Sequence, residues 1–329
     1  MENNTKQPLL SICIPTWNRA QFLRLSLDSI KDQLSDIDNS KLEILVSDNC
    51  STDSTSQLVR SYMHEGMPIE YNRNEENIGF DRNFLKCTGM AKGKYILVAG
   101  DDDVLLPDSI KYLLDILAKE EWGLVHISTT GKNDVIEEYD NTDEFLKRIN
   151  HMITFITANI FRSDIVPGVN IPDKFSKSWF MYNQYYFTST FSRPRSIVLN
   201  RPLFKAGLDT DSNGGYNFYE VFVKAYLEMW NDRVLSDEIS ISTYKYIRKE
   251  MLMNFIVYRN YKFLFRRKKV RSFSEGTFER NGCSIDNAWS ILFHYYGGCW
   301  YFYYSLLLLP YLGLKDMAKY GLKRMGWRK

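Results

Sequence analysis

Short apolar runs alternate with segments of helical patterning over the first 130 residues. Between the runs, apolar side chains such as Leu23, Leu27 and Ile30 recur at the spacing of a helix. Strands that helices cover on both faces are typically continuous apolar runs. The pattern therefore predicts an α/β fold with a doubly wound, mostly parallel sheet. The predicted strands are residues 9–14, 42–47, 69–71, 95–99 and 124–128.

The rhythm changes after residue 130. A polar, acidic stretch precedes apolar or aromatic segments at 153–162, 179–187 and 196–204, and helical patterning dominates from residue 215. The length of 329 residues fits one large domain or two smaller ones. We predict a first domain over residues 1–210 and a helical C-terminal region over residues 211–329.

Composition and charge exclude several classes of protein. The apolar fraction of 44% and the charged fraction of 25% are those of a globular chain, which excludes wholesale disorder. A net charge of +2 gives no overall positive field for nucleic acid. The five cysteines form no CxxC pair, which argues against a disulfide framework and a zinc site. The N-terminus lacks the pattern of a signal peptide, so we expect a cytoplasmic protein.

Polar clusters follow three of the predicted strands. They lie at residues 15–19, 48–53 and 100–103. Ligands of such sheets bind beyond the carboxyl ends of the strands, so all three clusters are expected at one rim. That rim is where the sequence predicts a binding site.

Asp101, Asp102 and Asp103 are the strongest candidates for metal binding. Three consecutive carboxylates repel one another, and a divalent cation relieves that repulsion. Mg²⁺ or Mn²⁺ would complete its shell with phosphate oxygens, as a nucleoside diphosphate supplies. The alternative is a solvated turn in which Asp102 or Asp103 caps a helix that begins at Pro107.

Two further segments have both a binding and a structural interpretation. Asp48 at a strand end can accept hydrogen bonds from a base or a ribose, whereas residues 51–53 also suit the start of the next helix. Asn77 and Gly79 place a turn near the same rim. Arg82 after that turn can pair with a phosphate or can be an ordinary surface arginine.

Five segments together carry a family resemblance. ICIPTWNR, VSDNCSTDST, NIGFDRNF, AKGKYILVAGDDD and VLLPDSI, in this order over residues 9–117, resemble the nucleotide-sugar half of a family 2 glycosyltransferase with the GT-A fold. The resemblance implies sugar transfer from a nucleoside diphosphate donor, with inversion and with Mg²⁺ or Mn²⁺. It also implies a donor half over residues 1–110 and an acceptor half over residues 111–210.

The same resemblance assigns roles to individual residues. Asp48 would bind the base, Arg82 would lie near base and phosphates, and Asp102 would be the metal ligand. The donor cleft would be lined by Pro15, Thr16, Asn18 and Arg19, with Asn77, Gly79 and Asp101 nearby.

The chain departs from the family pattern at two positions. Gly100 stands where the first aspartate of the metal motif is expected, and this GDDD form resembles a subset acting in bacterial O-antigen synthesis that includes abequosyltransferase-like proteins. Asn183 stands where the general base is expected, and an amide cannot take a proton from an acceptor hydroxyl at neutral pH. Asp103, Asp209 and Asp211 are the remaining candidates for that base, although turn chemistry also explains the last two.

The aromatic residues concentrate in two places. The segment at 179–187 could stack on acceptor sugars, but aromatics at helical spacing more often form a core. Residues 295–314 carry no charge and are rich in tyrosine, and Gly297, Gly298 and Pro310 are expected to break them into short pieces. An interfacial helix and a core helix both fit.

A membrane location agrees with the charges near that stretch. The basic run at 266–271 and the basic tail after residue 314 would face anionic headgroups. A polyprenyl-linked glycan acceptor would lie at the same surface, on the inner face of the cell membrane. Two rival interpretations remain: a non-catalytic sugar-nucleotide or glycan-binding module, and a nucleotidyltransferase.

Overall fold

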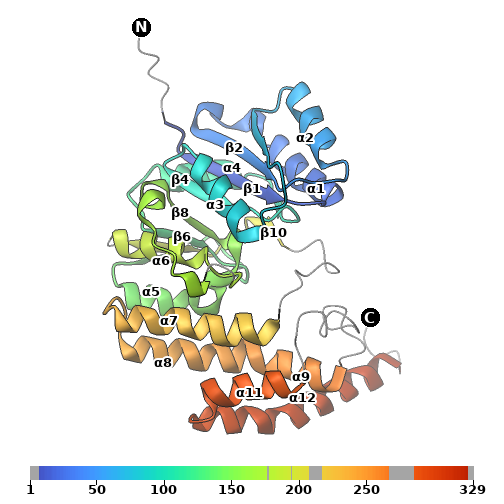
Figure 1. Ribbon diagram of the computed structural model, residues 1–329, viewed down its shortest axis with the longest axis vertical. Helices are drawn as coiled ribbons and strands as arrows, with labels where there is room; N and C mark the ends of the chain where they lie inside the picture. Colours follow the sequence, from blue (N-terminus) through green and yellow to red (C-terminus); the bar gives the residue numbers. More distant parts are fainter. Residues whose placement is uncertain (1–6, 176–177, 194, 207–216, 267–284, 325–329) are drawn as a thin grey trace. The chain divides into compact units, whose positions relative to one another are not determined.

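The computed structural model describes residues 7–175, 178–193, 195–206, 217–266 and 285–324. The chain divides into two compact units, residues 1–209 and 210–329 (Figure 1). The first unit is an α/β domain, and the second is helical. Among the described helices, none has the length and apolar character needed to cross a bilayer.

The first unit is built on an eight-stranded sheet with the order β3-β2-β1-β4-β8-β6-β9-β7. The first four of these strands are mutually parallel, while β8 runs antiparallel to both of its neighbours. The strands are β1 (Leu10–Thr16), β2 (Leu42–Asp48), β3 (Ile69–Arg73), β4 (Tyr95–Val98), β6 (Leu124–Ile127), β7 (Ile136–Tyr139), β8 (Asn159–Arg162) and β9 (Ser196–Leu199). The five strands predicted from apolar runs are confirmed.

Helices cover both faces of this sheet. Along β1, Leu10, Ile12 and Ile14 pack into one core with the apolar faces of α1, α2 and α4. Cys13 points to the opposite face, as alternation along a strand requires, and lies against α3. Aromatic contacts of Phe161 place α6 on that second face. The helices are α1 (Ala20–Lys31), α2 (Thr55–His64), α3 (Phe80–Met90), α4 (Ser109–Leu117), α5 (Thr142–Ile149) and α6 (Asn183–Ser192).

A small second sheet pairs β5 (Val104–Leu105) with β10 (Phe204–Lys205). This pair holds the segment after the three aspartates against the Pro202–Leu203 turn. Leu203 accepts hydrogen bonds from the Leu106 amide and from the Ser109 hydroxyl. The start of α4 is therefore fixed by tertiary contacts rather than by a side-chain cap.

The second unit consists of helices that pack on one another. Wider π turns at Glu220–Ala225 and Met251–Ile256 lead into α7 and α9. The unit contains α7 (Tyr226–Leu235), α8 (Ile241–Glu250), α9 (Val257–Arg266), α11 (Ile285–Tyr296) and α12 (Trp300–Arg324). The uncharged stretch breaks at Gly297 and Gly298 as predicted, but the predicted break at Pro310 is wrong. Pro310 is exposed, so water can satisfy the carbonyl that its missing N–H leaves unpaired.

Candidate active site

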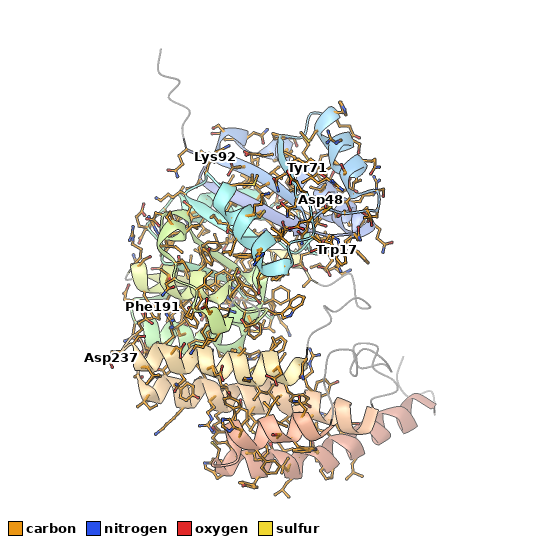
Figure 2. The ribbon with its side chains drawn as sticks, viewed as in Figure 1. Trp17, Asp48, Tyr71, Lys92, Phe191 and Asp237 are labelled. Atoms are coloured by element: carbon orange, nitrogen blue, oxygen red, sulfur yellow. The ribbon has the colours of Figure 1, made fainter. Side chains whose placement is uncertain are left out.

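The carboxyl ends of the parallel strands form one rim of the first unit. Thr16 at the end of β1 pairs in register with Asp48 at the end of β2, and Asp48 pairs with Arg73 at the end of β3. Figure 2 shows Trp17, Asp48 and Tyr71 in this same region. The structure thus brings the first two predicted clusters together.

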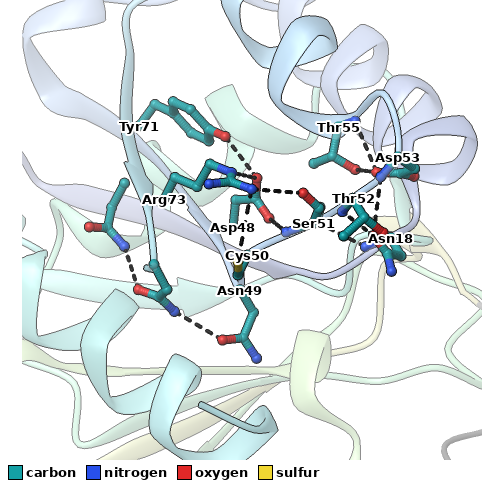
Figure 3. A network of polar contacts seen from close by, with 12 residues as sticks. Asn18, Asp48, Asn49, Cys50, Ser51, Thr52, Asp53, Thr55, Tyr71 and Arg73 are labelled. Carbon is teal, nitrogen blue, oxygen red and sulfur yellow. Dashed lines mark hydrogen bonds and ion pairs between the residues drawn. The ribbon is translucent and has the colours of Figure 1, made fainter. Parts of the chain in front are cut away.

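Asn18 ties the loop after β1 to the loop after β2 (Figure 3). Its side-chain oxygen accepts hydrogen bonds from the amides of Thr52 (2.7 Å) and Asp53 (3.3 Å), and its own amide donates to the Ser51 hydroxyl. Its backbone is left-handed, with φ of 54°, a conformation that asparagine tolerates better than most residues. These contacts fix the shape of the rim on this side.

Asp48 is completely buried beneath that loop. One carboxylate oxygen accepts a hydrogen bond from the Ser51 amide, and the other accepts one from the Tyr71 hydroxyl, each at 2.8 Å. Arg73 Nε lies 3.6 Å from the second oxygen. Burial and the neighbouring Asp48 raise the pKa of Tyr71 to about 12. Contact between Asp48 and a base would require Tyr71 or Arg73 to move aside.

The three aspartates after β4 face different partners. Arg19 bridges two of them, with Nε 2.8 Å from Asp101 and a terminal nitrogen 3.0 Å from Asp102. Thr16 Oγ1 donates to Asp101 at 2.7 Å, which joins the first strand end to the third cluster. Burial raises the pKa of Asp101 to about 6, although Arg19 and Thr16 act in the opposite direction. The hydroxyl of Thr157 donates to Asp103.

This arrangement suits a hard divalent cation in part. Over the described residues, no group of three or more His, Cys, Asp or Glu side chains converges as a metal site. However, Asp101 and Asp102 already hold one cationic group, the Arg19 guanidinium, and Asp102 keeps 21% of its side chain exposed. Carboxylate oxygens with an open side toward solvent fit Mg²⁺ or Mn²⁺ whose remaining ligands are phosphate oxygens.

The structure excludes the helix-cap alternative. A Cβ atom on Gly100 would lie 2.8 Å from an Asp103 carboxylate oxygen and 3.2 Å from Asp102, so a larger residue here would require these side chains to shift. The next helix, α4, begins at Ser109, and its N-cap residue is Asp108. Asp102 and Asp103 therefore do not cap it, and Pro107 precedes the helix rather than beginning it.

Asn77 and Gly79 shape the turn before α3. Asn77 accepts hydrogen bonds from the Asn49 side chain and from the Gly79 amide, at 2.8 and 2.9 Å. Gly79 has φ of 83°, which favours glycine. Arg82 is exposed on the first turn of α3, and Pro15 is half-buried in β1. The residues that line the turn thus hold its backbone, and Arg82 is left accessible to a phosphate.

Comparison with known proteins identifies the family. The model of glycosyl transferase family 2 matches residues 11–186, more than half of the chain, and the match includes the rim described above. The chain belongs to glycosyl transferase family 2. The family resemblance predicted from the five segments is confirmed.

Individual relatives match only part of their length. Abequosyltransferase RfbV of Salmonella typhimurium is 42% identical over 106 residues, which cover 32% of this chain and 31% of the relative. A Campylobacter jejuni enzyme named GalNAc(5)-diNAcBac-PP-undecaprenol beta-1,3-glucosyltransferase is 33% identical over 122 residues, 36% of this chain and 37% of the relative. The matched region thus spans about a third of each of these curated relatives.

A solved structure supports the GT-A fold of this family over most of the chain. S. aureus TarS 1-349 in complex with UDP-GlcNAc superimposes with a TM-score of 0.55, covering 87% of this chain and 80% of TarS. The sequence identity is 18%, so this likeness concerns the fold alone. The predicted fold class is confirmed.

Asn183, at the position where the family pattern places a base, is buried in the core. It begins α6 with no exposed surface, and its side-chain NH₂ group is 3.3 Å from the Phe180 carbonyl. Its side-chain oxygen has no hydrogen-bond partner among the described residues. Most of the aromatic segment around it is buried too, including Phe180, Tyr182 and Tyr186, so its interpretation as core is confirmed.

The sequence analysis missed Asp81, on the first turn of α3. One of its carboxylate oxygens is buried and, within the described chain, has no hydrogen-bond partner, while the backbone of Trp179 donates to the carboxyl group. Phe80 stacks on the Trp179 ring at 5.6 Å, and Tyr182 contacts both Phe80 and Phe84. Burial raises the pKa of Asp81 to about 7.

A carboxylate from α3 therefore reaches the segment that leads to Asn183. No signal in the sequence distinguishes this aspartate from an ordinary residue of the first helical turn, where acidic side chains are common. Of the other candidates for a base, Asp209 and Asp211 lie outside the described residues, as does the basic run from Arg267 to Arg271.

Proposed function

We propose that the protein is an inverting, metal-dependent glycosyltransferase that moves a sugar from a nucleoside diphosphate donor to a glycan acceptor. The observation that carries this proposal is the group formed by Asp101, Asp102, Arg19 and Thr16 at the rim of a family 2 sheet. This group concentrates carboxylate oxygens and one cation where the ends of β1 and β4 meet. Diphosphate chemistry needs both signs of charge at such a place.

The donor would be held by the loops after β1, β2 and β3. Asn18 and Asp48 keep these loops in shape, and Tyr71 and Arg73 cover Asp48 on the side of the rim. We assign base recognition to this cluster and phosphate contact to Arg82. The TarS structure, which has a similar fold and was solved in complex with UDP-GlcNAc, supports a nucleoside diphosphate sugar as the donor.

Asp102 would hold the divalent cation, with Asp103 nearby. When bound, Mg²⁺ or Mn²⁺ would neutralise the charge that develops on the departing diphosphate. Arg19 would remain at Asp101, because its Nε and the Thr16 hydroxyl both bind that carboxylate, and it would yield Asp102 to the metal. Thr157 would fix the rotamer of Asp103.

Asp81 is the described residue that best suits proton removal from the acceptor hydroxyl. One of its oxygens has no hydrogen-bond partner in the described part of the chain, its carboxyl group lies beside the segment that leads to Asn183, and a pKa of about 7 lies near the operating pH of a base. Asp103 is the second candidate, but one of its oxygens already accepts a hydrogen bond from Thr157. In this role Asp81 would accept the proton as the hydroxyl oxygen attacks the anomeric carbon.

The acceptor would be a polyprenyl-linked glycan in the synthesis of a bacterial surface polysaccharide, at the inner face of the cell membrane. The two relatives support this class, because one is named an abequosyltransferase and the name of the other includes a glycan linked to undecaprenol. A non-catalytic sugar-nucleotide or glycan-binding module is the second candidate, favoured by Asn183 at the usual position of the base.

A nucleotide-release assay tests the proposal. Purified protein is incubated with Mn²⁺ or Mg²⁺, a lipid extract as acceptor source, and UDP-, GDP-, CDP- and dTDP-sugars in turn. We expect metal-dependent release of one diphosphate by the wild type and loss of release in Asp102→Asn. Tight metal-dependent nucleotide binding without release from any donor would favour the binding module. No nucleotide binding at all would refute the assignment of the rim.

A further inference from the structure

Helix α12 is apolar on two opposite faces. Phe302, Ser305 and Leu309 are buried in the second unit, and Gly313 approaches the ring of Tyr261 on α9. In this unit α12 packs against α9, and its Phe302 contacts Phe293 and Tyr296 of α11 (Figure 1). This buried face forms one side of the helix. A surface helix of a globular protein normally carries polar residues on the other half.

The opposite half of α12 is instead aromatic and aliphatic. At 100° per residue, its members fall on the side away from Phe302 and Leu309. Each of them is exposed, from about half of the side chain in Tyr304 to 74% in Leu307. We call this surface the aromatic face; it consists of Trp300, Tyr303, Tyr304, Leu307, Tyr311 and Leu314. Contiguous exposed apolar surfaces of this kind mark sites of interaction.

The residue types favour a lipid surface over water or a protein core. Tyrosine and tryptophan combine an apolar ring with a polar tip, and they concentrate at the boundary between hydrocarbon and headgroups. Four of the six members are of these two types, and the two leucines lie among or beside them. A helix in the plane of the boundary can insert such side chains without losing its backbone hydrogen bonds.

Positive charge lies at both ends of the aromatic face. The ammonium group of Lys249 lies 5.6 Å from the centre of the Trp300 ring, and exposed Lys315 follows Leu314 directly. The chain from 300 to 314 contains no acidic residue, and the helix continues to Arg324 with one acidic residue, Asp316, and the basic residues Lys319 and Lys323 in its sequence. Cations beside an apolar face match anionic headgroups beside hydrocarbon.

We infer that the aromatic face of α12 binds the surface of an anionic lipid bilayer, with the helix lying in the plane of the headgroups. A second copy of the chain fits less well, because pairing two such faces would bring their flanking lysines together. This inference deepens the proposed function, since a lipid-linked acceptor lies at the same surface. It concerns a part of the molecule separate from the donor rim, so the two can be tested apart.

Vesicle flotation of the full-length protein tests the inference. The probe is a vesicle of phosphatidylglycerol and phosphatidylcholine, compared with phosphatidylcholine alone. We expect the wild type to float with the anionic vesicle, and the Trp300→Ser/Leu307→Ser double variant to bind about tenfold more weakly or worse. Leu235→Ser is the matched control, because Leu235 is 75% exposed but lies at the end of α7. It should bind as the wild type does.

Several outcomes would overturn the inference. It is wrong if the wild type does not float, or if the double variant floats as well as Leu235→Ser. Light scattering without vesicles provides the third check: a dimer that the double variant dissociates would assign the face to self-association. Asp102→Asn should float normally while losing nucleotide release, so failure of the proposed chemistry would leave the lipid result intact.

Discussion

Asp81 is the residue whose charge state most directly links the site to stability. An unfolded aspartate has a pKa near 4, whereas burial raises the pKa of Asp81 to about 7 in the folded protein. Between these values the folded state binds more protons than the unfolded state. The free energy of unfolding therefore decreases as the pH rises from about 4 to about 7.

Replacing Asp81 with asparagine should remove this decrease in stability at higher pH. We expect Asp81→Asn to be more stable than the wild type at pH 8, by about 1–2 kcal/mol because the carboxyl group is partly exposed to water. At pH 4 the two proteins should be similarly stable. Urea denaturation at both pH values measures the difference in the free energy of unfolding. Equal stability of the two proteins at pH 8 would show that the pKa of Asp81 is not raised.

The same substitution tests the proposed base. If Asp81 accepts the proton of the acceptor, the nucleotide-release rate of the wild type should rise through about pH 7, the pKa of Asp81, and Asp81→Asn should lose both that rise and at least about 100-fold in rate. Donor binding should change little. A variant that is slower at every pH by the same small factor would assign Asp81 a merely structural role.

Arg19 competes with any divalent cation for the same carboxylates. Its contacts with Asp101 and Asp102 neutralise negative charge that would otherwise attract a metal ion. Arg19→Gln should therefore bind Mn²⁺ more tightly in the absence of nucleotide, by about fivefold, or roughly 1 kcal/mol. Isothermal titration calorimetry measures this, with Asp102→Asn as the control that binds poorly. Weaker binding by Arg19→Gln would mean that the guanidinium orients these carboxylates for the metal.

A site residue was predictable where residues near it in the sequence determine its position and its environment. Thr16, Asp48 and Asp101 follow strands, and parallel strands bring their ends to one edge, so the rim could be predicted from the pattern. Asp81 could not, because its environment comes from Trp179, nearly 100 residues away. The pairing of Arg19 with Asp101 and Asp102 likewise depends on a turn whose geometry the sequence does not reveal.

At the scale of elements, Gly93 shows how closely the connection before β4 approaches β1. A Cβ atom at this position would lie 2.5 Å from the Ser11 hydroxyl and 2.7 Å from the Ser11 amide. The Gly93 amide donates to that same hydroxyl at 2.8 Å. Gly93→Ala should therefore lower the free energy of unfolding by about 2–3 kcal/mol.

Gly89 is the matched control for that substitution. It lies on the exposed side of α3, and a Cβ atom there would meet nothing within 4 Å. Gly89→Ala should stabilise the protein by about 0.5–1 kcal/mol, because alanine favours the helix. Urea midpoints of the two variants should thus move in opposite directions. A neutral Gly93→Ala would show that Ser11 moves aside without cost.

Helices and strands were predictable where the apolar periodicity was strong. They were less predictable where tertiary contacts determine the direction or the boundaries of an element. The five apolar runs became strands, yet the antiparallel direction of β8 could not be predicted, because an apolar run carries no direction. The start of α4 depends on the turn at Leu203, a contact between segments about 100 residues apart. Pro310 continues a helix because it faces water, and exposure is not a local property of the sequence.

At the scale of the whole molecule, the two units carry different proposed tasks. Every described residue assigned to donor, metal or proton transfer belongs to the first unit, and the core cluster that includes Leu10, Ile12 and Ile14 draws only on that unit. The aromatic face belongs to the second unit. The two units meet at residue 209. We propose that this division separates nucleotide chemistry from lipid binding.

A fragment ending at residue 209 should therefore retain donor binding and lose lipid binding. Its sheet is complete, since β9 and β10 end before that residue, and the core cluster that α1, α2 and α4 form with the sheet lies wholly within it. We expect it to bind the donor nucleotide, in the presence of Mn²⁺, with an affinity within about threefold of the full chain, because no proposed contact is removed. Thermal shift and calorimetry measure this, and flotation measures the lost lipid binding.

The controls decide between a failed fold and a failed assignment. The fragment must first show a cooperative thermal transition, and Asp102→Asn within the fragment should lower its metal-dependent binding as it does in the full chain. A cooperatively folded fragment that binds no nucleotide would place part of the donor site in the second unit. A fragment that still floats with anionic vesicles would place the lipid-binding surface in the first, because the aromatic face is then absent.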